Sequence, residues 1–174
     1  IQTMKRQQED LKVTVPISNN PAKRLAGQLN GRLVGVFGAD FLAPVARRWK
    51  GQMSEVAKSW AQFEYLPEAD HNTLAGLINP SRELERAMFL FLKAPSDHPR
   101  NNLRLDLTRQ IFMQEGINTD MVEAKGEVPL AHMWSMLHMG DYTAYYLAMS
   151  YGVDPTPVAS IENLKVEMAR DEAK

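Results

Sequence analysis

The chain contains no cysteine in its 174 residues. This absence excludes a disulfide framework, a thiolate nucleophile and a zinc site built on cysteine ligands. It is compatible with a reducing compartment, and we therefore expect the protein to be cytoplasmic.

The chain also lacks an excess of charge of either sign and any long apolar run. It has 20 basic and 21 acidic residues, so its formal net charge is -1. This balance gives no electrostatic reason to expect a nucleic acid or an acidic membrane surface as partner. No apolar run approaches the roughly 20 residues needed to cross a bilayer, and residues 1–6 lack the apolar stretch of a signal peptide. We therefore expect a soluble protein that binds a small molecule or another copy of itself.

Internal repeats, low-complexity tracts and linkers rich in Gly or Ser are absent as well. With 44% apolar residues, a chain of this length can bury one sizeable core. We predict a single domain over residues 1–174, in which residues 1–19 form a lead-in segment. The start at Ile1, followed almost at once by charged residues, gives the chain the appearance of a fragment or a processed product.

Helical and strand patterns alternate along the sequence. The patterns predict strands over residues 32–38, 61–66, 86–92 and 121–124. They predict helices over residues 21–30, 41–58, 71–79 with Asp70 as N-cap, 99–115, 129–151 and from the 154–157 turn to about 169. This order predicts an α/β fold, a three-layer αβα sandwich around a doubly wound, flavodoxin-like parallel sheet. The ligand crevice of such a sheet is expected at the carboxyl ends of its strands.

Two segments after the first predicted strand carry residues with chemical potential. Residues 47–50 (Arg-Arg-Trp-Lys) lead into residues 54–58 (Ser-Glu-Val-Ala-Lys), and residues 66–72 (Leu-Pro-Glu-Ala-Asp-His-Asn) follow. Glu55 and His71 are 16 residues apart. The stretch resembles the Arg-Trp-Lys helix, the Asn-Glu-Asn-x-Lys segment and the Pro-Glu-x-x-His-Asn turn of archaeal and bacterial phosphoglucose/phosphomannose isomerases.

Further matches to this family lie near the C-terminus. Residues 137–148 resemble its Leu-Gly-Asp-Tyr-x-x-x-Tyr-Leu-Ala helix, and residues 152–158 and 161–165 complete the resemblance. Ser54 and Val56 depart from the pattern, since the family usually has Asn at these positions, and they change the hydrogen-bonding groups next to the intervening glutamate. The chain is thus identified as a member of the family's C-terminal sugar-isomerase (SIS) domains, with an SIS-type fold.

The resemblance implies an aldose-ketose isomerisation of glucose 6-phosphate or mannose 6-phosphate to fructose 6-phosphate through an enediolate. The matching proton-transfer base is Glu55, because a carboxylate can reach both C1 and C2 of the opened sugar. The matching ring-opening group is His71, which in this family comes from the other subunit of a homodimer. Lys165 matches a lysine that donates to the ring oxygen or stabilises the enediolate. Thr156 and Asn72 are expected to bind the substrate.

A Ser/Thr-rich phosphate loop is missing from the sequence. The nearest segment, residues 18–20 (Ser-Asn-Asn), lacks the Ser-x-Ser-Gly-x-Thr character of a phosphate site at a helix N-terminus. The resemblance implies that an N-terminal SIS domain of the parent chain supplies this loop, together with an arginine from a Pro-Arg-Ser turn. We therefore expect residues 1–174 alone to show little or no turnover.

No cofactor and no metal are expected. His132 and His138 lie six residues apart on one predicted helix, so they do not share a face as a pair of metal ligands would. The surrounding methionines favour packing as the role of both histidines.

Simpler roles exist for each candidate residue. Apart from the resemblance, Glu55 fits a solvated carboxylate, His71 a polar residue at a helix start, and Lys165 a partner of Glu162 at helical spacing. The alternative function is therefore a non-catalytic phosphosugar-binding or dimerisation module of the same fold. A third hypothesis is a deaminating or transferase relative acting on amino sugars, for which we would expect other nucleophilic groups.

Overall fold

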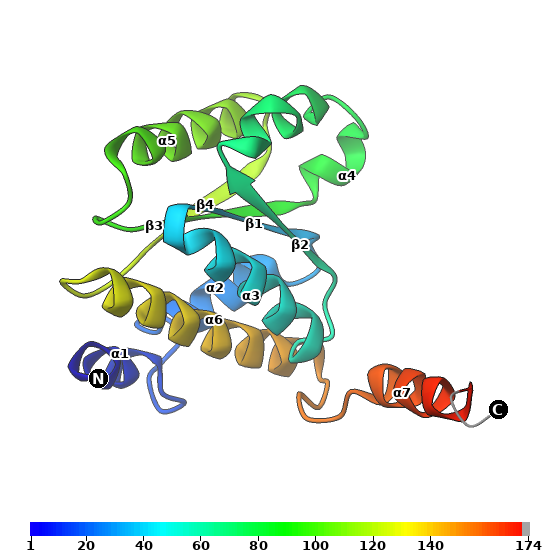
Figure 1. Cartoon of the computed structure of the whole chain (residues 1–174). Helices are drawn as coiled ribbons and strands as arrows, with labels where there is room; N and C mark the ends of the chain where they lie inside the picture. The colour runs from blue at the N-terminus through cyan, green and yellow to red at the C-terminus, as the bar shows by residue number, and fades with distance from the viewer. Residues whose placement is uncertain (172–174) are drawn as a thin grey trace.

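The computed structural model describes residues 1–171 and contains a four-stranded parallel sheet between two groups of helices (Figure 1). The strands are β1 (Val34–Ala39), β2 (Ala61–Leu66), β3 (Met88–Lys93) and β4 (Asn118–Glu123). Their order in the sheet is β2-β1-β3-β4, and every neighbouring pair is parallel. The chain therefore winds in opposite directions from β1, which confirms the predicted doubly wound sheet.

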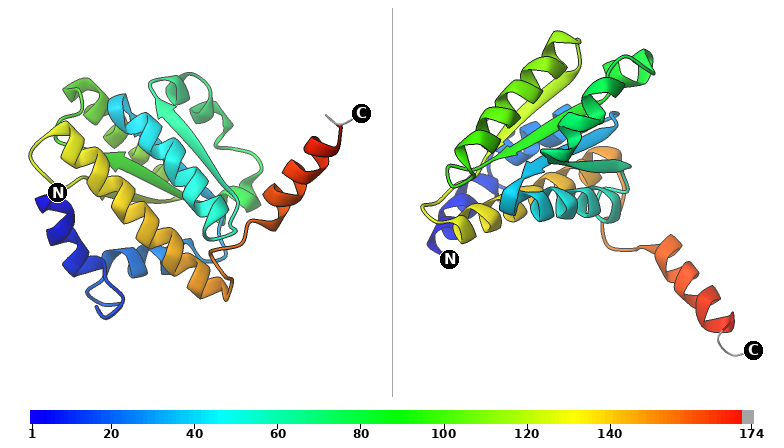
Figure 2. Two further views of the ribbon diagram at one scale, coloured as in Figure 1. Left: turned by 60° about the horizontal axis from the view of Figure 1, so that its bottom comes forward. Right: turned by 45° about the horizontal axis from the view of Figure 1, so that its top comes forward.

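The two faces of the sheet are covered by different helices. One face carries α2 (Pro21–Leu29), α3 (Ala43–Glu55) and α6 (Pro129–Tyr151), which share a single apolar cluster with the strands. The other face carries α5 (Pro99–Gln114) and a second apolar cluster. Figure 2 shows the three layers from two further directions. The predicted three-layer αβα sandwich is therefore confirmed.

Local sequence explains the bounds of the central elements. All six residues of β1 are buried, as the apolar run predicts for a strand covered on both faces. Asn20 caps α2 by accepting hydrogen bonds from the backbone N–H groups of Ala22 and Lys23, both 3.1 Å long. Gly152 ends α6 with a φ of 67°, a left-handed conformation that favours glycine.

The helix predicted over residues 71–79 is wrong. The segment instead forms two short 3-10 turns, η2 (Glu68–His71) and η3 (Thr73–Gly76), and a five-residue helix α4 (Ser81–Glu85) follows. Gly76 and Pro80 disfavour a continuous helix there. The Asp70 carboxylate does not cap a helix but accepts hydrogen bonds from Thr108 Oγ1 at 2.8 Å and Arg104 at 3.2 Å.

The expected lead-in segment is a helix, α1 (Gln2–Leu11), that packs against α6. Its contacts are polar as well as apolar. His138 bonds to Gln7 Oε1 at 3.1 Å and to Gln8 Oε1 at 3.0 Å, and Tyr146 donates to the Leu11 carbonyl at 2.5 Å. The helix escaped the prediction because it has few apolar residues.

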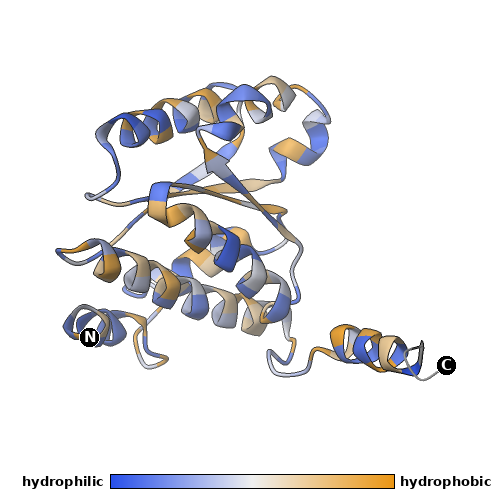
Figure 3. Ribbon diagram, viewed as in Figure 1, coloured by the Kyte–Doolittle hydropathy of each residue, from blue (hydrophilic) through white to orange (hydrophobic). Residues whose placement is uncertain are grey.

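The last helix, α7 (Ala159–Asp171), projects from the rest of the molecule (Figures 1 and 2). Its existence and length agree with the prediction. Ile161, Leu164 and Met168 are exposed on it, and the apolar positions are visible in Figure 3. Within residues 1–171, no helix combines the length and apolar character required to cross a membrane.

Helices α3 and α6 pack closely together at Gly140, which has no side chain. Trp49 of α3 is fully buried, and its indole N–H donates to the Met136 carbonyl of α6 at 2.9 Å. A Cβ atom at Gly140 would lie only 2.6 Å from Trp49 Nε1 and from Gln52 Oε1. Glycine at position 140 is therefore what allows the two helices to approach this closely.

We predict that Gly140→Ala lowers the free energy of unfolding by about 2–3 kcal/mol, because the new methyl group overpacks a buried contact. Urea unfolding of the chain measures the change. The matched control is Gly27→Ala in α2, where an added Cβ meets nothing within 4 Å. This control should stabilise the chain by about 0.5–1 kcal/mol, since alanine favours a helix interior. Equal effects of the two substitutions would contradict the role of Gly140.

A buried carboxyl follows β3 at the carboxyl end of the sheet. Asp97 is 3% exposed, and one of its oxygens accepts a hydrogen bond from the Ala94 backbone N–H at 2.7 Å. Its other oxygen has no hydrogen-bond partner among the described residues. Burial raises the pKa of Asp97 to about 6, and the nearby Asp40 carboxylate adds to the increase.

Because this pKa is raised in the folded state, the folded chain holds a proton that the unfolded chain releases at lower pH. We therefore predict that the contribution of Asp97 to the free energy of unfolding decreases as the pH rises from about 4 to about 6 and is constant at higher pH. Asp97→Asn should flatten this part of the pH profile. Free energies of unfolding measured in urea for both chains across pH 4–8 test the prediction, and parallel profiles would refute it.

Candidate active site

An open cleft lies at the edge of the sheet where the strands begin. It has a volume of about 420 Å³ and is lined by residues from the end of α3 and the start of α7. The lining from α3 and the residues after it is Ser54, Glu55 and Lys58, and the lining from the other side is the segment 157–161. The cleft therefore combines a carboxylate, an ammonium and two serine hydroxyl groups.

Glu55 reaches this cleft because α3 runs antiparallel to β1 and ends beside the start of β2. Its side chain is exposed. One turn earlier, Gln52 is buried and donates hydrogen bonds to the Leu137 carbonyl at 3.3 Å and to the Asp141 carboxylate. These bonds, with that of Trp49, fix the end of α3 against α6 and thus set the position of Glu55.

The turn that contains Thr156 approaches the cleft from the other side. The Thr156 backbone N–H donates to the Asp154 carboxylate at 2.9 Å, and this bond is the main reason that the pKa of Asp154 lies below its ordinary value. The Lys58 ammonium donates to the carbonyls of Glu55 at 2.5 Å and Pro155 at 3.1 Å. Lys58 belongs to the Ser-Glu-Val-Ala-Lys motif, but nothing in that motif predicts this bridge.

Lys165 lies on α7 and is exposed. Only the first turn of that helix lines the cleft, so Lys165 is not among the lining residues. Thr156 is not a lining residue either, but the Lys58 bond to the Pro155 carbonyl places its turn next to the cleft. Of the five candidate residues, Glu55 alone lines the cleft.

His71 and Asn72 lie at the opposite edge, directly after the carboxyl end of β2. Both are exposed. Asn72 Oδ1 accepts hydrogen bonds from the backbone N–H and the hydroxyl of Thr73, at 2.6 and 3.0 Å, and its amide donates to Glu68 at 3.1 Å. The side chain of Asn72 thus holds its own turn in shape. The crevice expected at the carboxyl ends of the strands receives His71 and Asn72 but not Glu55.

The loop after β1 differs from a phosphate-binding loop. Asp40 follows this strand with a φ of 46°, and its carboxylate accepts hydrogen bonds from the His98 backbone N–H at 2.8 Å and from Asn101 at 2.7 Å. An acidic side chain at the switch point of the sheet disfavours an anionic ligand there. This agrees with the absence of a Ser/Thr-rich loop from the sequence.

The two histidines of α6 have hydrogen-bond partners within the fold. His132 bonds through Nδ1 to Ser96 Oγ at 2.6 Å and through Nε2 to the Gly126 carbonyl at 3.0 Å, whereas His138 bonds to the glutamines of α1. Over residues 1–171, no group of three or more His, Asp or Glu side chains is arranged to hold a metal ion.

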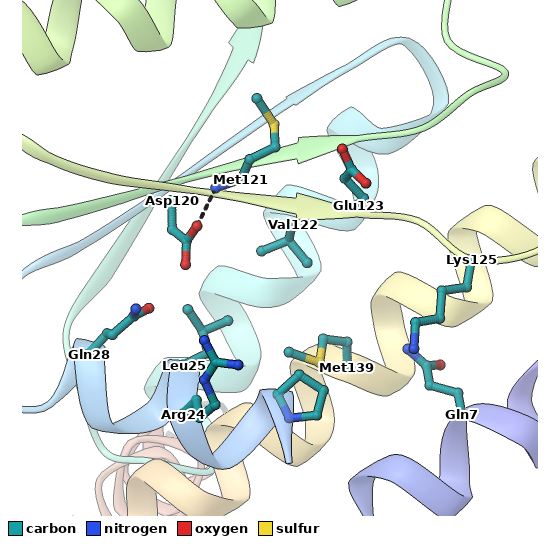
Figure 4. Close-up of a pocket in the computed structure, with 11 residues that line it drawn as sticks. Gln7, Arg24, Leu25, Gln28, Asp120, Met121, Val122, Glu123, Lys125 and Met139 are labelled. Atoms are coloured by element: carbon teal, nitrogen blue, oxygen red, sulfur yellow. Dashed lines mark hydrogen bonds between the residues drawn. The ribbon is translucent and has the colours of Figure 1, made fainter. Parts of the chain in front are cut away.

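A second groove, of about 240 Å³, lies along the β4 edge of the sheet (Figure 4). Arg24 and Gln28 of α2 face Asp120 of β4 across it, the Glu123 side chain points to the other face of the strand, and Lys125 lies at one end. None of the candidate residues lines this groove. Its mixture of acidic and basic groups favours no ligand of one charge.

Comparisons with known proteins agree with the architecture and with the motifs. The protein from Aquifex aeolicus named bifunctional phosphoglucose/phosphomannose isomerase is 34% identical over 162 residues, which cover 93% of this chain and 50% of that protein. The protein of the same name from Caldicellulosiruptor bescii is 36% identical over 162 residues, covering 92% of this chain and 48% of its own length. The chain thus spans about half the length of these relatives.

A solved structure gives the same result. The crystal structure of a glucose-6-phosphate isomerase like protein from Thermus thermophilus superposes with a TM-score of 0.76 at 28% identity, over 88% of this chain and 51% of that one. Residues 18–168 match the family described as the bacterial phospho-glucose isomerase C-terminal SIS domain. Because this match covers most of the sequence, the chain belongs to the family of C-terminal SIS domains of bacterial phosphoglucose isomerases.

Proposed function

We propose that this chain is the part of a sugar-phosphate isomerase that supplies the proton-transfer base. The reaction is the interconversion of glucose 6-phosphate or mannose 6-phosphate with fructose 6-phosphate through an enediolate. The observation that carries the proposal is the cleft in which Glu55 lies opposite residues 157–161, because Glu55 and the segment that begins this wall belong to motifs that resemble those of the isomerase family.

The chemistry requires one carboxylate to serve two neighbouring carbons. Glu55 would remove the proton from C2 of the opened aldose and return it to C1, while the hydroxyl proton moves between the two oxygens. Its exposed position at the end of α3 leaves the carboxylate free to reach a substrate in the cleft. In the single chain, the Glu55 carboxylate is open to water. The surface that excludes water from the site would therefore come from the rest of the protein.

Ring opening would use His71 from a second copy of the chain. Glu55 precedes β2 and His71 follows it, and a strand of six residues spans about 16–20 Å. Two side chains on opposite ends of such a strand cannot act on one small sugar within the same chain. A homodimer in which each copy supplies His71 to the other resolves this separation.

The remaining candidates have supporting roles in the proposal. Thr156 and Asn72 would bind the hexose hydroxyls, and Lys165 would donate to the ring oxygen or stabilise negative charge on the enediolate. Because Lys165 lies on the projecting helix α7, this role requires α7 to pack near the substrate in the assembled protein. A further SIS domain of the parent chain would bind the phosphate, and the cytoplasm is the proposed location.

We predict that Glu55→Gln in the full-length protein lowers kcat of the isomerisation by about 10²- to 10⁴-fold and leaves KM little changed. The amide keeps the shape of the side chain but cannot accept the proton. The measurement is exchange of the C2 proton of glucose 6-phosphate with solvent deuterium, followed by NMR. Glu9→Gln in α1, whose side chain is exposed far from the cleft, is the control. Retained exchange in the Glu55 variant would favour the non-catalytic binding module.

The proposed sharing of His71 predicts recovery of activity in mixed dimers. A Glu55→Gln protein and a His71→Ala protein should each be inactive. Mixing them under conditions that exchange subunits should restore up to about a quarter of the wild-type activity, since half of the dimers are mixed and each contains one intact site. If both groups acted within one chain, every site in a mixed dimer would lack one of them, and no activity would return.

A further inference from the structure

Lys58 connects the two sides of the cleft through a single ammonium group. Its Nζ donates to the Glu55 carbonyl at 2.5 Å and to the Pro155 carbonyl at 3.1 Å, across 97 residues of sequence. The first bond is to the last residue of α3, and the second is to the turn that precedes α7. The positive charge lies at the C-terminal end of α3, where the helix dipole favours a cation.

Lys58 has a backbone conformation in which glycine would be expected, so the presence of a lysine needs a reason. Its φ is 55°, in the left-handed region that glycine adopts most easily and that is common just after a helix. Conformation alone would therefore favour glycine at this position. A lysine is less stable than glycine in this backbone conformation. The two hydrogen bonds of the Lys58 ammonium offset this cost.

The bridge also determines where the next elements lie. Pro155 is followed by Thr156 and by the segment 157–161, which forms one wall of the cleft opposite Glu55. The α7 helix, with Lys165, starts from the same segment. In residues 1–171, α7 itself has few contacts with the body of the molecule, so the turn is the main support for its direction. Loss of the bridge would free this wall relative to the end of α3.

We propose that Lys58 is a positioning residue, which holds the Glu55 end of α3 at a fixed distance from the turn of Thr156 and the start of α7. This inference rests on the proposed function of Glu55. Lys58 acts through the two carbonyl groups that it joins and does not itself take part in proton transfer. A shift of about 1 Å between catalytic groups can cost about 100-fold in rate.

The test uses the full-length protein with three substitutions at this position. Lys58→Met removes the ammonium but keeps most of the side-chain volume, and we expect it to lower kcat by about 10- to 100-fold with KM changed by less than about threefold. Lys58→Arg retains a charged donor of similar length and should recover most of the lost kcat. Lys12→Met, at the half-exposed lysine that follows α1 and pairs with Glu9, is the matched control and should retain full activity.

Lys58→Gly separates positioning from folding. It relieves the left-handed backbone conformation while it removes the bridge, so we expect a thermal midpoint within about 3 °C of wild type. Its kcat should nevertheless fall as far as that of Lys58→Met. A stable glycine variant with wild-type kcat would overturn the proposal. A methionine variant that raises KM and leaves kcat unchanged would overturn it too, since that result means direct substrate binding.

The outcome is distinguishable from failure of the proposed function. If Glu55→Gln is inactive while the Lys58 variants are fully active, the positioning role is wrong and the function of Glu55 stands. If Glu55→Gln itself retains activity, the proposed function fails, whatever the Lys58 variants do.

Discussion

The direction of α3 relative to β2 is the constraint on which the candidate site depends. Because the helix runs antiparallel to the strand, Glu55 at its end lies beside the first residues of β2, whereas His71 follows the last. Rotation of side chains cannot close a gap of the length of a strand. The fold itself thus divides the candidate groups between two edges of the sheet.

The supports of the two walls of the cleft differ in kind. The Glu55 wall is held by a buried network in which Trp49 and Gln52 of α3 bond to the backbone of α6. The opposite wall is held by exposed hydrogen bonds from Lys58 and within the Asp154 turn. Exposed bonds are individually weak because water competes for the same groups. The first wall is therefore a fixed part of the core, whereas the position of the second depends on a few bonds at the surface.

Periodic apolar patterns were sufficient to predict the sheet and its long helices. The buried run of β1, the glycine that ends α6 and the alternation of elements each have a local cause, and the structure agrees with them. The errors occurred where the determining contact is distant in sequence. Asp70 does not cap a helix because its carboxylate bonds to Arg104 and Thr108 of α5. The polar helix α1 is held in place by hydrogen bonds with His138 and Tyr146 of α6.

The same reasoning applies to the candidate residues. Their identity came from motifs, but their division between two edges of the sheet follows from how α3 and β2 are connected, which no single motif contains. The bridge from Lys58 to Pro155 joins positions 97 residues apart, and its donor is a type of residue that is usually solvated. Sequence spacing carries no information about such a contact.

The close packing at Gly140 limits how the protein can change over evolutionary time. Every other amino acid would place a Cβ atom against the Trp49 indole and the Gln52 amide, so no single replacement at this position is neutral. Drift there would have to follow a compensating loss of bulk at position 49 or 52. Since those same side chains anchor the end of α3, a lineage that lost the glycine would first have to replace the contacts that set the position of Glu55.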